Sequence, residues 1–164
     1  RLNPEKGKTL NRLLVQNVIT GCTVMINKAL KDKIKLLPEQ MIMYDRWISL
    51  AAAAFGKIDY VPTATILYRQ HDNNIIGAKA WNVCYVMKML SGMSSIKTTL
   101  QKTQLQAGAF LDVFRDELTE KHMDSLNVYS TLGQQSFFIK RLNLIKYRFF
   151  KMGFLRNIGL FLTV

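Results

Sequence analysis

The segments NVITGCTVMIN (residues 17–27), MYDRW (residues 43–47) and YRQHDNNIIGA (residues 68–78) combine strand and helix signals with a Gly turn, an acid, an arginine and one of the chain's two histidines. Reactive side chains that form a site are typically held on regular elements in this way. We therefore take residues 17–78 as the part of the chain around which the remainder is organised. The flanking segments then serve as support.

Length and composition indicate a globular protein with an unusual charge. A chain of 164 residues is most often one domain, or one domain with an appendage. Hydrophobic residues make up 49% and charged residues 21%, which argues against a disordered chain or a fibre. The net charge of +12 predicts attraction to phosphate groups. Composition leaves three sources open: nucleic acid, an anionic membrane surface or a phosphorylated small molecule.

Cysteine usage and hydropathy predict a cytoplasmic protein that does not span a membrane. Cys22 and Cys84 are widely spaced and outside any metal-type cluster, so we expect both to be reduced and buried. The sequence has no apolar leader of the signal type and no run of about 18 apolar residues. Because it opens on Arg1 rather than Met, we expect a piece of a longer protein or a processed start.

Residue patterns predict an α/β fold that is rich in helices. β-branched residues predict strands at 17–26, 58–61 and 63–68. Capping residues predict helices that begin after Asn27 and at Asp45, the second one ending at Gly56. From residue 80 onward the spacing of apolar residues predicts helices alone. We therefore expect two units, an α/β unit at 1–79 and a helical extension at 80–164.

The residue types of the central stretch suit the transfer of a group from a phosphorylated donor. Asp45 at a helix start could accept a proton from an acceptor hydroxyl, or it could merely cap the helix. His71, preceded by Arg69, could bind a divalent cation or contact a phosphate, or it could be structural. Gly21 could let backbone N–H groups approach a donor, or it could simply form a turn. The residue patterns alone predict an α/β domain with a candidate polar site.

The C-terminal segment carries much of the charge imbalance, because no acid follows Asp124. Residues 136–156 mix phenylalanines and leucines with lysines and arginines. Such a segment can lie in a membrane interface as an amphipathic helix. It can equally form a helical hairpin that buries its aromatic residues and leaves its cations in water. A nucleic-acid partner is not expected, because no known binding fingerprint accompanies the charge.

Four ordered blocks resemble the C-terminal half of family 2 glycosyltransferases. They are NVITGCTVMIN (17–27), MYDRW (43–47), AAFGKIDY (53–60) and YRQHDNNIIGA (68–78), and they are spread over residues 17–78 of the chain. The likeness is greatest to the rhamnosyltransferase-like branch, bacterial enzymes that build cell-surface polysaccharide. The resemblance implies a GT-A fold, a nucleotide-sugar donor, a divalent metal (Mg or Mn), and inversion of the anomeric centre by direct displacement.

The resemblance also implies roles for individual residues. Asp45 matches the catalytic base, Tyr44 stands where Glu or His often precedes it, and Trp47 matches an aromatic residue that shapes the acceptor site. His71 matches the histidine that approaches the metal or the diphosphate. The residues implied to line the donor pocket are Thr20, Gly21, Cys22, Arg69 and Gln70.

The chain departs from the family pattern upstream of these blocks. The family places its nucleotide-binding βαβ units and an Asp-x-Asp metal motif before the Thr-Gly block, and only sixteen residues precede Asn17 here. We therefore expect this chain alone neither to bind a nucleotide-sugar tightly nor to turn over. Strands without their usual neighbours would leave open edges, so a homo-oligomer is also expected.

Two functions of different classes follow. The first is the catalytic C-terminal part of an inverting glycosyltransferase at the cytoplasmic face of the plasma membrane, acting on a saccharide or a lipid-linked acceptor. The alternative is a non-catalytic helical interaction or membrane-docking module.

Overall fold

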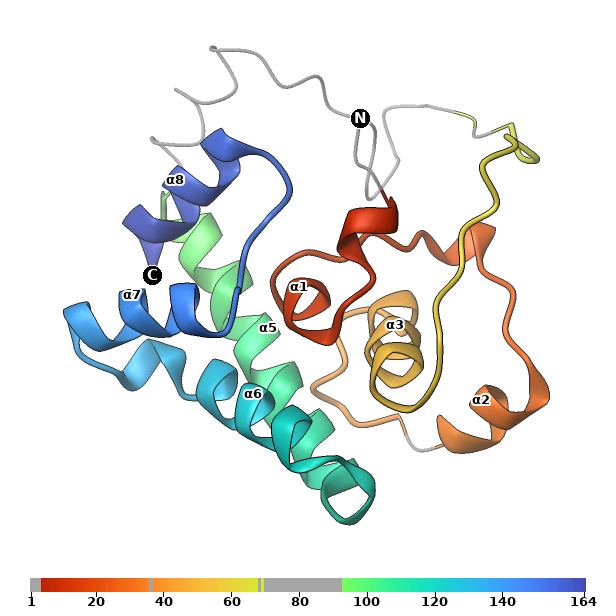
Figure 1. Ribbon diagram of the computed structural model, residues 1–164, viewed down its shortest axis with the longest axis horizontal. Helices are drawn as coiled ribbons and strands as arrows, with labels where there is room; N and C mark the ends of the chain where they lie inside the picture. The colour runs from red at the N-terminus through yellow and green to blue at the C-terminus, as the bar shows by residue number, and fades with distance from the viewer. Residues whose placement is uncertain (1–3, 36, 68, 70–92) are drawn as a thin grey trace.

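The computed structural model describes residues 4–35, 37–67, 69 and 93–164, and every regular element in these ranges is helical (Figure 1). The helices are η1 (Pro4–Gly7), α1 (Leu10–Val15), η2 (Gly21–Thr23), α2 (Lys28–Lys33), α3 (Tyr44–Phe55), α5 (Met93–Phe114), η3 (Arg115–Glu117), α6 (Glu120–Ser130), η4 (Leu132–Gln134), α7 (Phe137–Lys146) and α8 (Phe154–Thr163), where η marks a 3₁₀ helix. No strand occurs in these ranges. The expected α/β class, and with it the GT-A fold, is therefore wrong for the part of the chain that is described.

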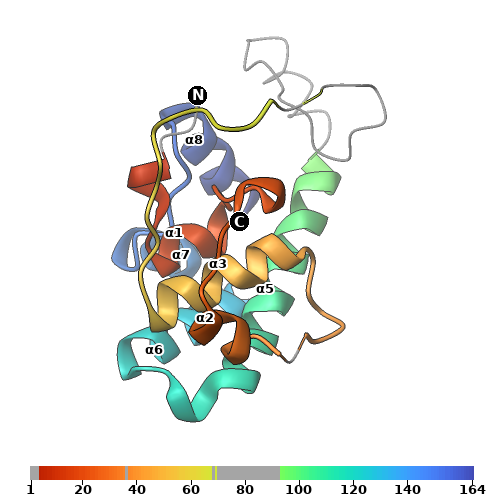
Figure 2. The same cartoon turned by 90° about the vertical axis from the view of Figure 1, so that its right-hand side faces the viewer.

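The segments that were predicted to be strands form no strand in the described residues. Residues 17–26 contain only the short helix η2, and residues 58–67 have no regular structure. Figures 1 and 2 show the second segment, in yellow, passing along the outside of α3. Val61 and Leu67 are exposed there, as is Met25 in the first segment. β-branched residues favour an extended backbone, but a strand also needs a neighbour that accepts its hydrogen bonds.

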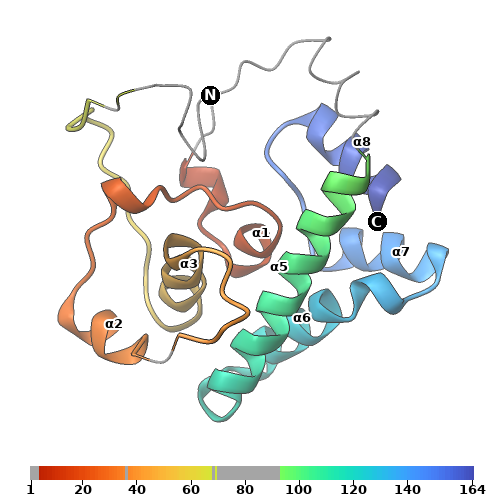
Figure 3. The same cartoon turned by 180° about the vertical axis from the view of Figure 1, so that it is seen from behind.

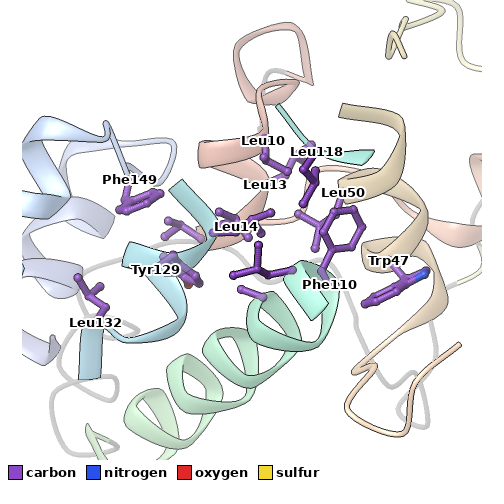
Figure 4. Packing of buried hydrophobic residues seen from close by; sticks show 14 of the residues in the cluster. Leu10, Leu13, Leu14, Trp47, Leu50, Phe110, Leu118, Tyr129, Leu132 and Phe149 are labelled. Carbon is purple, nitrogen blue, oxygen red and sulfur yellow. The ribbon is translucent and has the colours of Figure 1, made fainter. Parts of the chain in front are cut away.

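The core lies where α1, α3, α5 and α6 meet. α5 and α6 form a hairpin joined by η3, and α1 contacts both of them as well as α3. Figure 4 shows leucines of α1 between the aromatic residues of α3 and α5 on one side and those of α6 on the other. The Trp47 and Phe110 rings meet edge to face at 5.1 Å, and Phe110 lies 4.7 Å from Phe114. Such aromatic pairs add to the stabilisation that comes from burying their area.

Two hydrogen bonds join α1 and the residue after it to the C-terminal region. Asn11 Nδ2 donates to the Tyr147 carbonyl at 2.7 Å, and the Met152 N–H donates to Gln16 Oε1 at 2.7 Å. The buried cluster likewise draws residues from both sides of the predicted unit boundary at 79 and 80. The boundary itself lies outside the described residues.

Several helix boundaries agree with their sequence signals. Asn27 caps α2, because its side chain accepts from the Leu30 N–H, and Gly56 ends α3. Ser136 immediately precedes α7. The expected cap at Asp45 is wrong: α3 begins at Tyr44 after Met43, so the carboxylate is free to bond elsewhere.

Residues 93–164 are helical as expected, while residues 80–92 lie outside the described part of the chain. The last basic segment divides into α7 and α8, separated by residues 147–153 in which Arg148 and Gly153 have positive φ. Among the described helices, none combines the length and apolar character needed to cross a bilayer.

Candidate functional site

The candidate site is formed where the loop at residues 17–23 meets the first turn of α3. Asp45 Oδ2 accepts a hydrogen bond from the Gly21 N–H at 3.1 Å, and Oδ1 accepts one from Asn17 Nδ2 at 3.3 Å. These bonds connect residues that are 24 and 28 positions apart in the sequence. Two blocks that share a site in the sequence interpretation are therefore in direct contact. We call Asn17, Gly21 and Asp45 the Asp45 site.

The loop holds its shape through bonds of its own. The Asn17 side chain accepts from the Ile19 N–H at 3.0 Å and donates to the Ile19 carbonyl at 2.9 Å. The Thr20 carbonyl then accepts from the backbone N–H of Thr23 and from its hydroxyl, which closes the turn of η2. Asparagine side chains commonly replace backbone partners in turns in this way. The Gly21 N–H is consequently held in position to donate to Asp45.

Tyr44 lies directly over Gly21. A Cβ atom at position 21 would fall 2.6 Å from Tyr44 Cζ, well inside van der Waals contact. A side chain at position 21 would therefore force the exposed Tyr44 ring to move away from the loop. Because the Tyr44 side chain is itself exposed, it forms part of the outer wall of the site.

Arg46 fixes the other side of the first turn of α3. Its guanidinium donates to the carbonyls of Leu13 and Leu14 at the end of α1. Burial lowers the pKa of Arg46, while the nearby charge of Asp45 acts in the opposite direction. Cations are stabilised near helix C-termini, where backbone carbonyls lack partners. Arg46 therefore fixes the first turn of α3 against the end of α1, and with it the position of Asp45 next to the loop.

The carboxylate of Asp45 is nearly enclosed. The residue is 5% exposed, and each of its oxygens has accepted one hydrogen bond. An ionised carboxylate has about four lone-pair directions, so two remain for a ligand hydroxyl or a water molecule. A further hydrogen bond can come only from a group that reaches the small exposed part of the residue.

The surroundings of Asp45 do not fit a divalent cation. Its described neighbours offer an N–H, an amide NH₂ and a guanidinium, all of which donate hydrogen bonds rather than coordinate a metal. Within the described ranges, no cluster of three or more acidic, histidine or cysteine residues could hold a metal ion. We therefore assign no metal-dependent step to this site.

The remaining predicted residues have different positions. Thr20 and Cys22 are exposed on the loop. The expectation that Cys22 is buried is wrong, because η2 leaves it at the surface, although it is a free thiol as expected. Trp47 is fully buried against Phe110 in the core.

The predicted residues after the β-rich run are placed only in part. Arg69 is exposed. Gln70, His71 and Cys84 lie outside the described residues, so the structure does not show where His71 lies relative to Asp45.

Sequence reasoning missed the role of Asn17. The residue marked only the start of the motif, yet its side chain orients both the loop and the carboxylate. The available signal was an asparagine placed shortly before a Thr-Gly turn, a pattern that favours a local side-chain turn.

Comparisons of the chain with protein-family models, with curated proteins and with solved structures gave no match.

Proposed function

We propose that the chain supplies the acceptor-activating part of an inverting glycosyltransferase, with Asp45 as its general base. The observation that carries the proposal is the hydrogen bond from the Gly21 N–H to Asp45 Oδ2, which unites two motif blocks across 24 positions. The blocks themselves resemble those of family 2 glycosyltransferases that build bacterial cell-surface polysaccharide. Rhamnose is the first donor sugar to test, with a saccharide or a lipid-linked sugar as acceptor.

The chemistry assigned to Asp45 is a single proton transfer. The acceptor hydroxyl oxygen forms a bond to the anomeric carbon as its proton passes to the carboxylate. The bond from that carbon to the diphosphate oxygen breaks, and the nucleoside diphosphate leaves with the electron pair. Asn17 and Gly21 hold the carboxylate through its other lone pairs, so it needs no reorientation during the step. A positioned base of this kind typically contributes about 10²–10⁴-fold in rate.

Asp45→Asn tests this assignment, measured in the longest natural form of the protein with nucleotide-sugar and acceptor. We expect transfer to fall by about 10²–10⁴-fold, because the amide cannot take up the proton. Asp112→Asn is the matched control, since Asp112 is exposed on α5 and its carboxylate pairs with Arg115 at the start of η3. Unchanged transfer in a folded Asp45→Asn variant would exclude Asp45 as the base.

A second candidate function is favoured by the enclosure of Asp45. A carboxylate that is 5% exposed, with both oxygens bonded, can serve simply to fasten the loop to α3. The chain would then be a non-catalytic helical interaction module. In that case Asp45→Asn lowers the free energy of unfolding by about 1–3 kcal/mol. The complete protein would show no transfer with any nucleotide-sugar, with or without the substitution.

As the location of the enzyme we propose the cytoplasm, at the inner face of the plasma membrane. There the basic C-terminal helices would keep it close to a lipid-linked acceptor.

A further inference from the structure

α7 exposes a stripe of apolar side chains to solvent. Phe138, Leu142 and Ile145 are spaced by four and three residues, which places them on one face of the helix. Each of the three is more than half exposed, and Phe138 is 76% exposed. Leu144 alone is buried in this helix. α7 therefore uses one side for the core and leaves a second apolar side in contact with solvent.

α8 repeats this arrangement. Phe154, Ile158 and Leu162 are spaced by four residues and are exposed, Phe154 to 79%. The opposite side of the helix contributes Leu160 and Thr163 to the interior. A short helix whose exposed side is this apolar is unusual on a protein that is surrounded only by water.

The two helices are attached to each other at one end of the molecule. The Arg141 guanidinium donates to the Phe161 carbonyl at 2.8 Å and lies over the Phe137 ring at 3.5 Å. Phe150, in the segment that joins the two helices, stacks on Phe161 of α8. Figures 1 and 3 show α7 and α8 next to each other beside the C-terminus. We call the two stripes together the α7–α8 surface: Phe138, Leu142, Ile145, Phe154, Ile158 and Leu162.

Cations lie beside the α7 part of this surface. The sequence after Asp124 contains six lysines and arginines and no acid. On a helical projection Arg141 and Lys146 flank the α7 stripe on its two sides, whereas Lys140 and Arg156 project from the opposite sides of their helices. Lys146 is exposed. An occupant of the surface must therefore be apolar where it meets the two stripes and anionic at the edges of the α7 stripe.

Three classes of partner can be compared for this surface: a second copy of the chain, a nucleic acid and a lipid bilayer. The first two fit it poorly. A second copy docking through the same surface would bring the flanking cations of α7 against the same cations of its partner, since a two-fold interface pairs each patch with itself. A nucleic acid would satisfy the cations but leave the phenylalanines without an apolar partner. A bilayer that contains anionic phospholipid offers acyl chains and negative headgroups in one place. Helices of ten residues are about 15 Å long, which suits the interface plane.

We propose that the α7–α8 surface is a peripheral docking site for bilayers that contain anionic phospholipid. α7 and α8 lie in the plane of the interface, with the apolar stripes inserted among the upper acyl chains and the flanking cations at the headgroups. The proposal is independent of any catalytic role of Asp45, because it depends on different residues and a different measurement.

The test is vesicle flotation of the 164-residue chain with phosphatidylcholine alone and with phosphatidylcholine mixed with phosphatidylglycerol. We expect binding to the mixed vesicles and little to the neutral ones. Phe138→Gln with Leu142→Gln should weaken binding by about tenfold or more, because two apolar side chains are lost from the membrane. Lys146→Gln should weaken it by about fivefold, and added salt should weaken the wild type.

The matched control is Leu105→Gln with Lys102→Gln, which removes an exposed leucine and an exposed lysine from α5 instead. The control should bind like the wild type. All the substituted positions are surface positions, and far-UV circular dichroism checks that each variant remains folded. Equal binding by the α7 and α5 variants would overturn the proposal. So would dimerisation that Phe138→Gln abolishes while no vesicle is bound, which would assign the surface to a second copy.

Discussion

At the scale of single residues, Asp45 joins two segments of the chain through hydrogen bonds to its carboxylate. It sits one residue inside α3 and accepts from Asn17 and Gly21 on a different segment. Local signals correctly placed Asn27 as a cap and Gly56 as a helix end, since those roles depend on bonds to residues within about four positions. They misassigned Asp45 because its partners are 24 and 28 positions away. Local preference contains no information about contacts at that distance.

A second residue with a testable property is His122 in the first turn of α6. Burial lowers its pKa from 6.5, and the charge of Lys121 lowers it further. Between that lowered value and 6.5, the unfolded chain binds a proton that the folded chain does not. Stability is therefore retained above 6.5 and lost as the pH falls below it. The helix N-terminus disfavours a positive charge at this position as well.

We predict that His122→Gln reduces the loss of stability on acidification. Urea unfolding at about pH 7.5 and about pH 5.5 should show a smaller fall for the variant than for the wild type, because carboxylates titrate alike in both. Gln also suits this third helical position, after the Thr119 cap. A fall of the same size in both proteins would contradict the prediction.

At the scale of elements, α5 is the helix on which the others assemble. Its Phe110 is fully buried and meets Trp47 of α3, while the Thr103 hydroxyl lies 2.8 Å from the Tyr129 hydroxyl of α6. Burial also raises the pKa of Tyr129, which keeps that phenol neutral. One helix thus provides both the aromatic and the polar contacts of the core.

Phe110→Ala should lower the free energy of unfolding by about 3–5 kcal/mol, because it leaves a cavity beside Trp47 and Phe114. Leu105→Ala on the same helix is the control and should change it by about 0.5 kcal/mol or less, since Leu105 is exposed. Chemical denaturation followed by circular dichroism measures both. Similar losses in the two variants would mean that the core is not centred on Phe110.

The helices of the C-terminal part were predictable and the strands were not. Apolar spacing over many residues indicates a helix directly, because the helix satisfies its own backbone groups. A strand signal such as that of residues 58–67 reports only that an extended backbone is acceptable. Whether a sheet forms depends on a neighbour, and none is present among the described residues. The predicted fold class is therefore wrong at the segments where strand pairing decides the structure.

At the scale of the whole molecule, the described parts on either side of residue 80 share one core. Leu13 and Trp47 lie in the same buried cluster as Tyr129 and Leu160. The sequence predicted two units because strand signals end before residue 80 and apolar spacing after it predicts helices alone. Such local patterns do not show which surfaces come together on folding.

We predict a single cooperative unfolding transition for the chain. In a Trp81→Phe background, fluorescence reports Trp47 alone, while far-UV circular dichroism reports the helices on both sides. The two signals should have the same midpoint in urea. Separate midpoints would instead indicate independent units at 1–79 and 80–164.

The hydrogen bonds from Asn11 to Tyr147 and from Met152 to Gln16 have a consequence for the order of events during synthesis. Each joins positions that are 136 residues apart. During synthesis these two bonds can form only after residues 147–152 have left the ribosome, so α1 completes its contact with the C-terminal region later than its contact with α3. Until then the part of α1 that this region covers is open to chaperones.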